Sequence, residues 1–473
     1  REELKRSRAL NMQSVAARFS HLVKTVIVVG LSLAALLVLT FGPRATDAYP
    51  AGAVVVDYWE KWTGEEEAGM RQIVDLFNSM VGKEKNIFVR YLSTSAIEQK
   101  TLVATAAGVP PDIAGLYNQN IPQYASMDAL MPLDDLAAQY GITEAYYKKV
   151  FWEECRFEGQ LYGLVSTAYN LALYYNTDLF RQRAAALRAA GLDPDRAPRT
   201  IAELDAYAKA LDVRDSSGRV ISSGYIPLEP GWYQAYTCIW FGGAWWDNST
   251  KRFTFTDPAV IRAYEWVRSY SQRLGATAMA EFRSGLGQFD SPQNAFLSGT
   301  VVMEQQGTFL ANFIATHKPD LKWAAAAFPS EDPSLVDVTY CNADVLVIPR
   351  GARHPREAFE FIAFVNRQDV MEKLANSHCK ISPLAEVSDQ FLDNHKNPYI
   401  RVFDHLAASP NAHPTEPIPI LAEVNAELDA FVQNLAMLKV EPAKGLADME
   451  VRLQRKYDDF MEQQRRRREL SRQ

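Results

Sequence analysis

The chain has 473 residues, of which 48% are hydrophobic and 23% are charged, and its formal net charge is −7. This composition is ordinary for a globular protein with a sizeable core, and the length allows two or three domains or one large two-lobed unit. The negative charge argues against a nucleic-acid partner. Basic residues concentrate at the two ends, and the run Arg465–Arg468 is typical of a solvated helix end, with attraction to a lipid surface as the alternative.

The N-terminal segment carries the clearest targeting signal. Residues 26–41 are apolar and lie between Lys24 and Arg44. At about 1.5 Å per residue such a helix would be roughly 24 Å long, slightly short for a bilayer. Thr46-Asp47-Ala48 offers a cleavage site between small residues, so a cleaved signal peptide and a retained membrane anchor both fit. In either case we expect the rest of the chain to be exported, to the periplasm or the outer face of the cytoplasmic membrane.

The elements predicted after this segment alternate between strands and helices. Val54–Trp59 is an apolar strand, and a helix with acidic residues in its first turn follows from Gly64. A strand at 86–92, a helix at 95–108 and a third strand before Tyr117 continue the alternation. This order predicts an α/β fold with a parallel sheet and helices on both faces.

Further strands and helices follow in the second part of the chain. Two strands are predicted at Gln160–Val165 and Leu171–Tyr175, and Asn176-Thr177-Asp178 is expected to cap the next helix. Thr200 and Glu203 form a capping-box pattern for another helix. The remaining pattern adds strands at 300–304 and within 343–351, and a mostly helical last hundred residues.

The four cysteines are Cys155, Cys238, Cys341 and Cys379, and their spacing does not fit a metal site. In an oxidising compartment they could form two disulfides. Buried free thiols are the alternative, and the sequence leaves both open.

No motif in the sequence points to catalytic chemistry. Patterns for a zinc-binding helix, a phosphate-binding loop, a nucleophile elbow and a kinase are absent. Carboxylate doublets such as Asp134-Asp135 fit helix caps or solvated helix faces. A glycosidase could still draw two acids from distant positions, so these absences disfavour an enzyme without excluding it. We expect no cofactor and no metal.

Aromatic and amide side chains gather near the ends of the predicted strands. In open α/β sheets ligands bind beyond the carboxyl ends of the strands, and flat rings together with neutral amides suit a sugar. The Trp-rich segment 232–246 belongs to this set, and we expect at least one of its tryptophans to contact the ligand, the alternative being that they fill the core. The expected ligand-binding residues are Trp59, Glu60, Trp62, Tyr117, Asn118, Tyr169, Asn170, Trp240, Trp245, Trp246, Gln305 and Asp344.

Eight segments together resemble the solute-binding proteins of ATP-binding-cassette importers, family 1, the group that includes maltose-binding protein. They are GVPPDI (108–113), EGQLYGLV (158–165), ALYYNTDLF (172–180), RTIAELDAYAKAL (199–211), WFGGAWWD (240–247), AFLSGTVVMEQQGTF (295–309), VLVIPRGARHPREAFEFIAFV (345–365) and ISPLAEV (381–387). The sequence departs from the family pattern at Phe309, where a tryptophan is usual, and in the run Glu304-Gln305-Gln306. These departures bear on the identity of the sugar.

The resemblance implies a two-lobed periplasmic-binding-protein fold of type II, with hinge strands and a ligand cleft between the lobes. It implies lobe 1 at 52–168 and 343–385 and lobe 2 at 169–342 and 386–464, after an N-terminal signal or anchor with its linker (1–50) and before a basic tail (465–473). The chain would first cross between lobes at Thr167–Asn170. Cys155 and Cys379 would lie in one lobe and Cys238 and Cys341 in the other, so we expect no disulfide between lobes.

The function implied by the resemblance is sugar or oligosaccharide binding and delivery to a membrane permease, by a monomer that performs no chemistry. One alternative is a binding protein for another ligand, such as a phosphorylated polyol or a metal. Tyr174 and Tyr175 are adjacent in a predicted strand and point to opposite faces, which disfavours a metal site built on both. The other alternative is a glycoside-acting enzyme.

Overall fold

The computed structural model describes residues 29–30, 32–33, 49–50, 52–228 and 233–471. The chain divides into two compact units, Arg1–Gly52 and Ala53–Gln473. In the first unit the described residues 29–30 and 32–33 are helical. The predicted signal peptide or anchor falls almost entirely outside the described residues, as does Trp232. Among the residues that are described, no helix is long and apolar enough to cross a membrane.

The second unit is built on an eight-stranded sheet. Its strand order is β11-β6-β13-β3-β1-β2, with β12 also paired to β6 and β14 to β13. The strands are β1 (Val54–Glu60), β2 (Ile87–Ser93), β3 (Ile113–Tyr117), β6 (Gly163–Asn176), β11 (Met303–Gly307), β12 (Trp323–Ala326), β13 (Thr339–Val347) and β14 (Ala412–His413). Three short hairpins stand apart: β4 (Arg156–Phe157) with β5 (Gln160–Leu161), β7 (Val213–Arg214) with β8 (Val220–Ser222), and β9 (Trp246–Asp247) with β10 (Arg252–Phe253).

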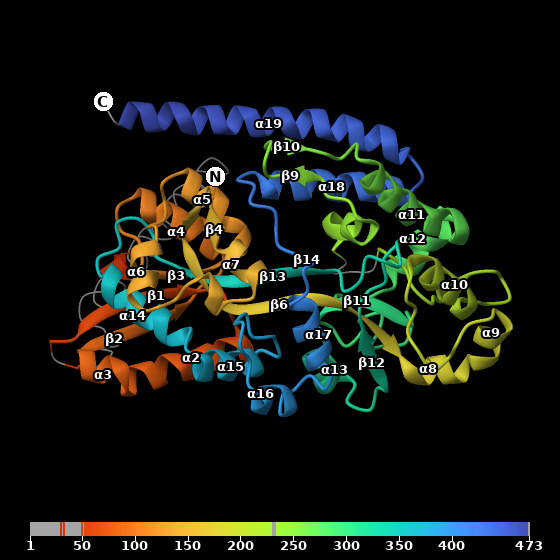
Figure 1. The fold of residues 1–473 in the computed structure, drawn as a ribbon, viewed down its shortest axis with the longest axis horizontal. Coiled ribbons are helices and arrows are strands. Elements are labelled where there is room, and N and C mark those ends of the chain that lie inside the picture. Colours follow the sequence, from red (N-terminus) through yellow and green to blue (C-terminus); the bar gives the residue numbers. More distant parts are fainter. Residues whose placement is uncertain (1–28, 31, 34–48, 51, 229–232, 472–473) are drawn as a thin grey trace, which may run out of the picture. The chain divides into compact units, whose positions relative to one another are not determined.

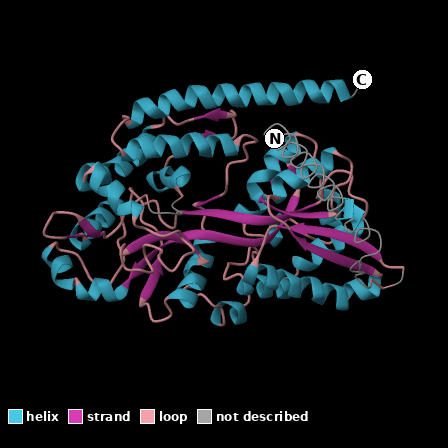
Figure 2. Cartoon of the chain, turned by 180° about the vertical axis from the view of Figure 1, so that it is seen from behind, coloured by secondary structure: helices cyan, strands magenta, loops and turns pink. Residues whose placement is uncertain are grey.

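Parallel pairing, as predicted, is found for the first three strands, and a short parallel pair also joins β14 to β13. β1 pairs in parallel with β2 and with β3, as the alternation of strands and helices predicts. β13 then joins β3 in the antiparallel direction, and β6 is antiparallel to β13. The sheet is mixed because its centre consists of two long strands that run between the two lobes in opposite directions (Figure 2).

Helices cover the sheet on both faces (Figure 1). Within 64–154 and 355–377 they are α2 (Gly64–Ser79), α3 (Val81–Lys85), α4 (Ile97–Ala106), α5 (Ile121–Ser126), α6 (Asp134–Gln139), α7 (Lys149–Glu154), α14 (Pro355–Val365) and α15 (Gln368–Ser377). The others are α8 (Thr177–Gln182), α9 (Ala184–Ala189), α10 (Ile201–Leu211), α11 (Pro258–Leu274), α12 (Ala276–Ser284), α13 (Leu310–His317), α16 (Asp389–Asp393), α17 (Ile400–Ala407), α18 (Leu421–Ala436) and α19 (Pro442–Ser471), with the 3-10 helix η3 (Gln234–Phe241).

Local sequence signals start several of these helices. The Asn176 side chain accepts a hydrogen bond from the Leu179 amide at the start of α8, which confirms the predicted cap. The Thr200 hydroxyl likewise accepts from the Glu203 amide. The capping box is incomplete, because the Glu203 carboxylate accepts from the Arg199 amide and from Arg196 rather than from Thr200. Such caps satisfy amides that lack a partner inside the helix.

The segment predicted as two strands with a crossing between them is one continuous strand. β6 runs unbroken over fourteen residues from Gly163 to Asn176. Its first half pairs with β13 and its second half with β11 and β12. Thr167–Asn170 therefore keeps extended backbone, because each part of the segment has a neighbouring strand to receive its hydrogen bonds.

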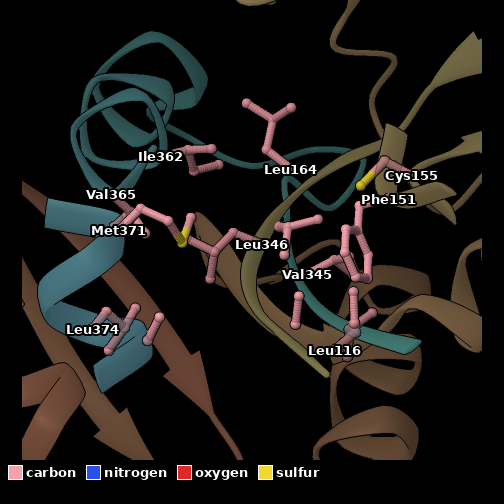
Figure 3. Packing of buried hydrophobic residues seen from close by; sticks show 14 of the residues in the cluster. Leu116, Phe151, Cys155, Leu164, Val345, Leu346, Ile362, Val365, Met371 and Leu374 are labelled. Carbon is pink, nitrogen blue, oxygen red and sulfur yellow. The ribbon is translucent and has the colours of Figure 1, made fainter. Parts of the chain in front are cut away.

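The buried hydrophobic residues form two clusters. In the first cluster, Leu346 lies on one face of β13 with side chains of α14 and α15, among them Ile362 and Met371 (Figure 3). Val345 points to the opposite face, toward Leu116 and Phe151 (Figure 3). This alternation is the ordinary period of a strand covered on both sides.

The second cluster gathers residues from α10, η3, α11, α18 and the first half of α19. Figure 1 shows α19 lying along α18 and running on beyond it. The four cysteines are buried and free, two of them, Cys155 and Cys341, within the first cluster. The predicted lobe boundaries stay a prediction.

Candidate ligand-binding site

A buried carboxylate on a crossing strand organises a group of charged side chains. Asp344 of β13 lies 2.9 Å from the ammonium of Lys61 and 2.9 Å from that of Lys380, and the Thr167 hydroxyl donates to it at 2.6 Å. Burial alone would raise the pKa of Asp344, but Lys380 and Lys61 outweigh it and hold this pKa well below its usual range. Lys61, Asp344, Lys380 and Thr167, together with Glu60, are called the charged cluster below.

Glu60, at the end of β1, fixes the position of Lys61. The Glu60 carboxylate accepts from the Tyr58 hydroxyl at 2.5 Å and from the Lys61 amide at 2.8 Å. It lies directly over Gly115 of β3, where a Cβ atom would overlap the carboxylate. Gly115 is therefore required for this close approach. Burial raises the pKa of Glu60, although the charge of Lys61 opposes the effect.

Aromatic rings border the charged cluster on the side of the first lobe. The Lys61 ammonium lies 4.5 Å from the centre of the Tyr117 ring and 5.1 Å from that of Trp62. The Lys380 ammonium lies 5.8 Å from the Trp62 ring. The Tyr117 side chain remains 39% exposed, so one part of its ring is available to a ligand. Cation–π contacts of this kind orient both partners.

A second set of rings begins on the same face of β6. Tyr169 follows Thr167 by two residues, and side chains at this spacing point to the same face of a strand. Tyr169 packs edge-to-face against Phe309 with ring centroids 5.2 Å apart, and its hydroxyl lies 3.4 Å from that of Tyr233. Phe289 and Phe313 extend the group beside Phe309. These five residues are called the aromatic wall.

The charged cluster and the aromatic wall lie close enough to act on each other electrostatically. Burial raises the pKa of Tyr233 to about 12, while a hydrogen bond to Tyr169 and the charge of Lys380 oppose the rise. Asp344 in turn contributes to the raised pKa of Tyr169, whose main cause is burial. The Phe309 ring folds back onto Gly307, where a Cβ atom would overlap the ring. The glycine that ends β11 thus sets the position of the wall.

The structure brings together only part of the predicted site. Glu60, Asp344 and Tyr169 belong to the two groups just described, and Trp62 and Tyr117 border the charged cluster. The other predicted residues outside the Trp-rich segment are buried or make contacts away from these two groups. Trp59 packs against the first core, Asn118 is buried, Asn170 is buried and donates to the Phe403 carbonyl, and Gln305 is buried within β11.

The three described tryptophans of the Trp-rich segment, Trp240, Trp245 and Trp246, lie in the second core. The Trp240 indole N–H donates to the Val338 carbonyl at 3.1 Å, and that of Trp245 donates to the Ala235 carbonyl at 2.8 Å. Trp246 packs edge-to-face against Phe253 and Tyr457. These rings are enclosed by side chains of their own lobe, because η3 and the β9–β10 hairpin carry them inward. We therefore leave all three out of the proposed site.

Sequence reasoning missed both lysines and most of the aromatic wall. Lys61 follows Glu60 at the end of a predicted strand, and that position is the only signal for it. Lys380 lies in an irregular segment after α15, and no sequence pattern connects it to Asp344. Phe309 stands out in the sequence only as a departure from the family pattern. Among the described residues, no group of three or more His, Cys, Asp or Glu is placed to hold a metal ion.

Comparison with known proteins identifies the family. Residues 72–397 match the family model described as bacterial extracellular solute-binding protein. The chain therefore belongs to the bacterial extracellular solute-binding protein family, which confirms the resemblance seen in the sequence. Family members are binding proteins.

Curated relatives match a part of the chain. Proteins of Brucella abortus and Brucella suis that are named as binding proteins are 23% identical over 283 residues. The matched region is 59% of this chain and 64% of each relative, so it covers less than two thirds of their length.

Solved structures share the two-lobed fold. CpMnBP1 with mannotriose bound is 24% identical with a TM-score of 0.71, over 84% of this chain and 99% of that one. UgpB of Mycobacterium tuberculosis in complex with glycerophosphocholine is 21% identical with a TM-score of 0.68, over 87% and 100%. The cyclic alpha-maltosyl-1,6-maltose binding protein of Arthrobacter globiformis is 18% identical with a TM-score of 0.66, over 84% and 97%. The fold is thus that of two-lobed solute-binding proteins.

Proposed function

We propose that this protein binds a neutral sugar or oligosaccharide between the charged cluster and the aromatic wall. The observation that carries the proposal is how the charges are paired. Both lysine ammonium groups lie at 2.9 Å from the same carboxylate, and Lys380 also lies 3.4 Å from Glu66. The charges therefore compensate one another, and the surfaces left for a ligand are ring faces and hydroxyl groups.

Ring faces and hydroxyls are the groups that a neutral polyhydroxyl ligand needs. The C–H faces of a sugar stack on aromatic rings, and its hydroxyls exchange hydrogen bonds with polar side chains. In the proposed site the ring faces come from Tyr117, which is 39% exposed, and from the half-buried Tyr169 and Phe309. Trp62 is buried and contributes by its cation–π contacts with Lys61 and Lys380. Asp344 holds the lysines in place and has its own oxygens occupied, so its role is positioning.

A phosphorylated ligand is the second candidate, because UgpB carries glycerophosphocholine. A phosphodiester requires positive charge that is free to pair with it. Lys61 and Lys380 both already have carboxylate partners, which favours the neutral ligand.

The physiological role we propose is uptake. The protein would be exported through its N-terminal segment, act as a monomer outside the cytoplasm, close its lobes around the sugar and deliver it to the permease of an ATP-binding-cassette importer. It would not alter the sugar. The lobe boundaries implied by the family resemblance belong to the same proposal, with β6 and β13 as hinge strands.

Titration calorimetry against a panel of ligands tests the proposal. Mannobiose and mannotriose come first, followed by a malto-oligosaccharide and glycerophosphocholine. We expect saturable binding of at least one sugar, with a negative heat-capacity change and no released reducing ends. Binding of glycerophosphocholine alone would establish the second candidate, and released reducing ends would establish an enzyme.

A matched pair of tyrosines locates the site. Tyr117 is 39% exposed and Tyr140 is 40% exposed, but Tyr140 lies at the end of α6, packed against Phe359. We expect Tyr117→Ala to weaken sugar binding about tenfold, which is about 1.4 kcal/mol, and Tyr140→Ala to leave it unchanged. Equal effects of the two substitutions would move the site elsewhere.

A further inference from the structure

Asn342 of β13 lies where the charged cluster and the aromatic wall meet. It is two residues from Asp344 on the same strand, and side chains at this spacing point to the same face. Across the sheet Asn342 pairs with Tyr169 of β6, and Asp344 pairs with Thr167. The Asn342 side chain therefore has a member of the charged cluster beside it on its own strand and a member of the aromatic wall opposite it, although it belongs to neither group.

This face of β13 is covered at both ends. Leu346 belongs to the first hydrophobic cluster and lies with side chains of α14 and α15 (Figure 3). Tyr340 belongs to the second cluster and stacks on Tyr236 of η3, with ring centroids 3.7 Å apart. Asp344 and Asn342 are the two residues of this face that lie between them. Because two lysines and a hydroxyl already occupy the Asp344 carboxylate, a ligand in the proposed site meets this stretch of the strand at Asn342.

The Asn342 amide group is held in one orientation. Its nitrogen donates to the Tyr340 hydroxyl at 2.9 Å and to the Thr415 hydroxyl at 3.1 Å. These two hydroxyls lie 2.8 Å apart, and the Thr415 backbone N–H donates to the buried Glu154 carboxylate at 3.2 Å. Both hydrogens of the amide are therefore in use, and its carbonyl oxygen is the group that remains for another partner.

The carbonyl oxygen of Asn342 is available to a ligand. Among the described residues no group donates to it, and it is not one of the enclosed side-chain atoms that lack a partner. Asn118 and Asn170, which the sequence suggested as ligand-binding residues, differ because their carbonyl oxygens are enclosed within the described part of the chain. A fixed, accessible acceptor next to aromatic rings is suited to a hydroxyl group of a ligand.

We propose that Asn342 determines specificity by accepting a hydrogen bond from one hydroxyl group of the sugar, with Tyr340 and Thr415 as positioning residues. The inference rests on the sugar-binding function proposed above and adds a requirement to it: the ligand carries a hydrogen-bond donor at this point. An analogue without that hydroxyl leaves the acceptor unpaired in the bound state, and binding sites discriminate strongly in this situation. An ionised phosphate at the same place offers no donor and is repelled by the carbonyl oxygen.

Titration calorimetry on the full chain at pH 7.5 measures the contribution of Asn342. The ligand is whichever of mannobiose, mannotriose and maltotriose binds the wild type most tightly, and we expect Asn342→Ala to weaken its binding about fivefold. The Tyr340 and Thr415 hydroxyls remain bonded to each other in this variant, so the chain should fold. The control is Asn434→Ala, which removes an exposed amide that donates to a carbonyl within α18 and should leave affinity unchanged. Equal affinities of the two variants overturn the proposal.

Monodeoxy analogues of the same sugar distinguish recognition from a structural role. For the wild type we expect one analogue, lacking the recognised hydroxyl, to bind at least fivefold more weakly than the parent sugar. In Asn342→Ala the parent and that analogue should bind within twofold of each other, because the acceptor is already gone. A structural role would instead weaken the parent and all analogues by the same factor, and that result overturns the proposal.

A pair of substitutions at Thr415 tests how the amide is positioned, whether or not Asn342→Ala folds. Thr415→Val removes the hydroxyl with little change of shape and is expected to weaken sugar binding two- to threefold and to reduce the discrimination against the same analogue. Thr415→Ser keeps the hydroxyl and is expected to recover that discrimination. Equal discrimination by the two variants overturns the positioning role.

The same titrations separate this inference from the function on which it rests. If the wild type binds none of the three sugars, the proposed function fails and the inference fails with it. If the wild type binds a sugar and Asn342→Ala binds it equally well, the inference fails alone.

Discussion

Two aromatic-rich regions of this protein look alike in sequence and differ in the structure. The Trp-rich segment around Trp240–Trp246 has the denser set of rings, yet Trp240 and Trp245 are enclosed in the second core with their indole N–H groups bonded to backbone carbonyls. The rings around β6, among them Tyr169 and Phe309, are only half-buried and stand beside the charged cluster. Aromatic content alone therefore does not identify a ligand site. What distinguishes the second region is rings that keep an open face next to polar groups.

Trp240→Ala is expected to have the largest effect on stability. Removing a fully enclosed indole leaves a cavity and an unpaired Val338 carbonyl, so the free energy of unfolding should fall by about 3–5 kcal/mol. Urea unfolding followed by fluorescence measures it. Sugar affinity of the folded fraction should stay the same. If affinity is lost while stability is kept, the Trp-rich segment is the ligand site and the comparison fails.

Asp344→Asn is expected to have the second-largest effect on stability, because it leaves two buried lysines without their shared carboxylate partner. Breaking a buried ion pair in this way costs about 3 kcal/mol. The pKa of Asp344 is lowered in the folded state, so its contribution is present above the unfolded value of about 4 and is lost as the pH falls below it. The difference between wild type and variant should therefore shrink between pH 5 and pH 3 in urea unfolding. A difference that stays constant over this range would show that Asp344 is not ionised.

Phe309→Leu tests the aromatic wall itself. The smaller side chain keeps the apolar contact with Phe313 but removes the ring face, and we expect sugar affinity to fall about tenfold by calorimetry. Stability should change by less than about 1.5 kcal/mol. Phe282→Leu, a partly buried residue packed on the second core, is the control and should not change affinity. If both variants bind equally well, the wall is structural like the Trp-rich segment.

The smallest expected effect is a difference in stability between two variants, Trp245→Phe and Trp246→Phe. Trp245→Phe leaves the Ala235 carbonyl without its donor, which costs about 1–3 kcal/mol. Trp246→Phe removes an indole N–H that has no partner among the described residues, so its cost should stay near or below about 1 kcal/mol. Parallel thermal unfolding of the two variants measures the difference. Equal losses would mean that the Trp246 indole is already paired.

Much of the local structure could be predicted from the sequence because the signals are local. Asn176 caps α8, Thr200 caps α10 through the Glu203 amide, and the first three strands pair in parallel as their alternation with helices indicates. Each of these features depends on residues a few positions apart or on hydrophobic patterns within one element. The continuity of β6 could not be predicted, because the strand is held by β11, β12 and β13, which follow much later in the chain.

The family was determined by the sequence, since the order of the family's segments survives at low identity. The tertiary structure alone decided which residues meet. Asp344 gathers Lys61 from the end of β1 and Lys380 from the segment after α15, and the strand alternation of β6 sets Tyr169 beside them. The physical reason is that a side chain's role depends on burial and partners. The fold assigns both: it buries the tryptophans in the second core and brings two lysines that no sequence pattern marks to the same carboxylate.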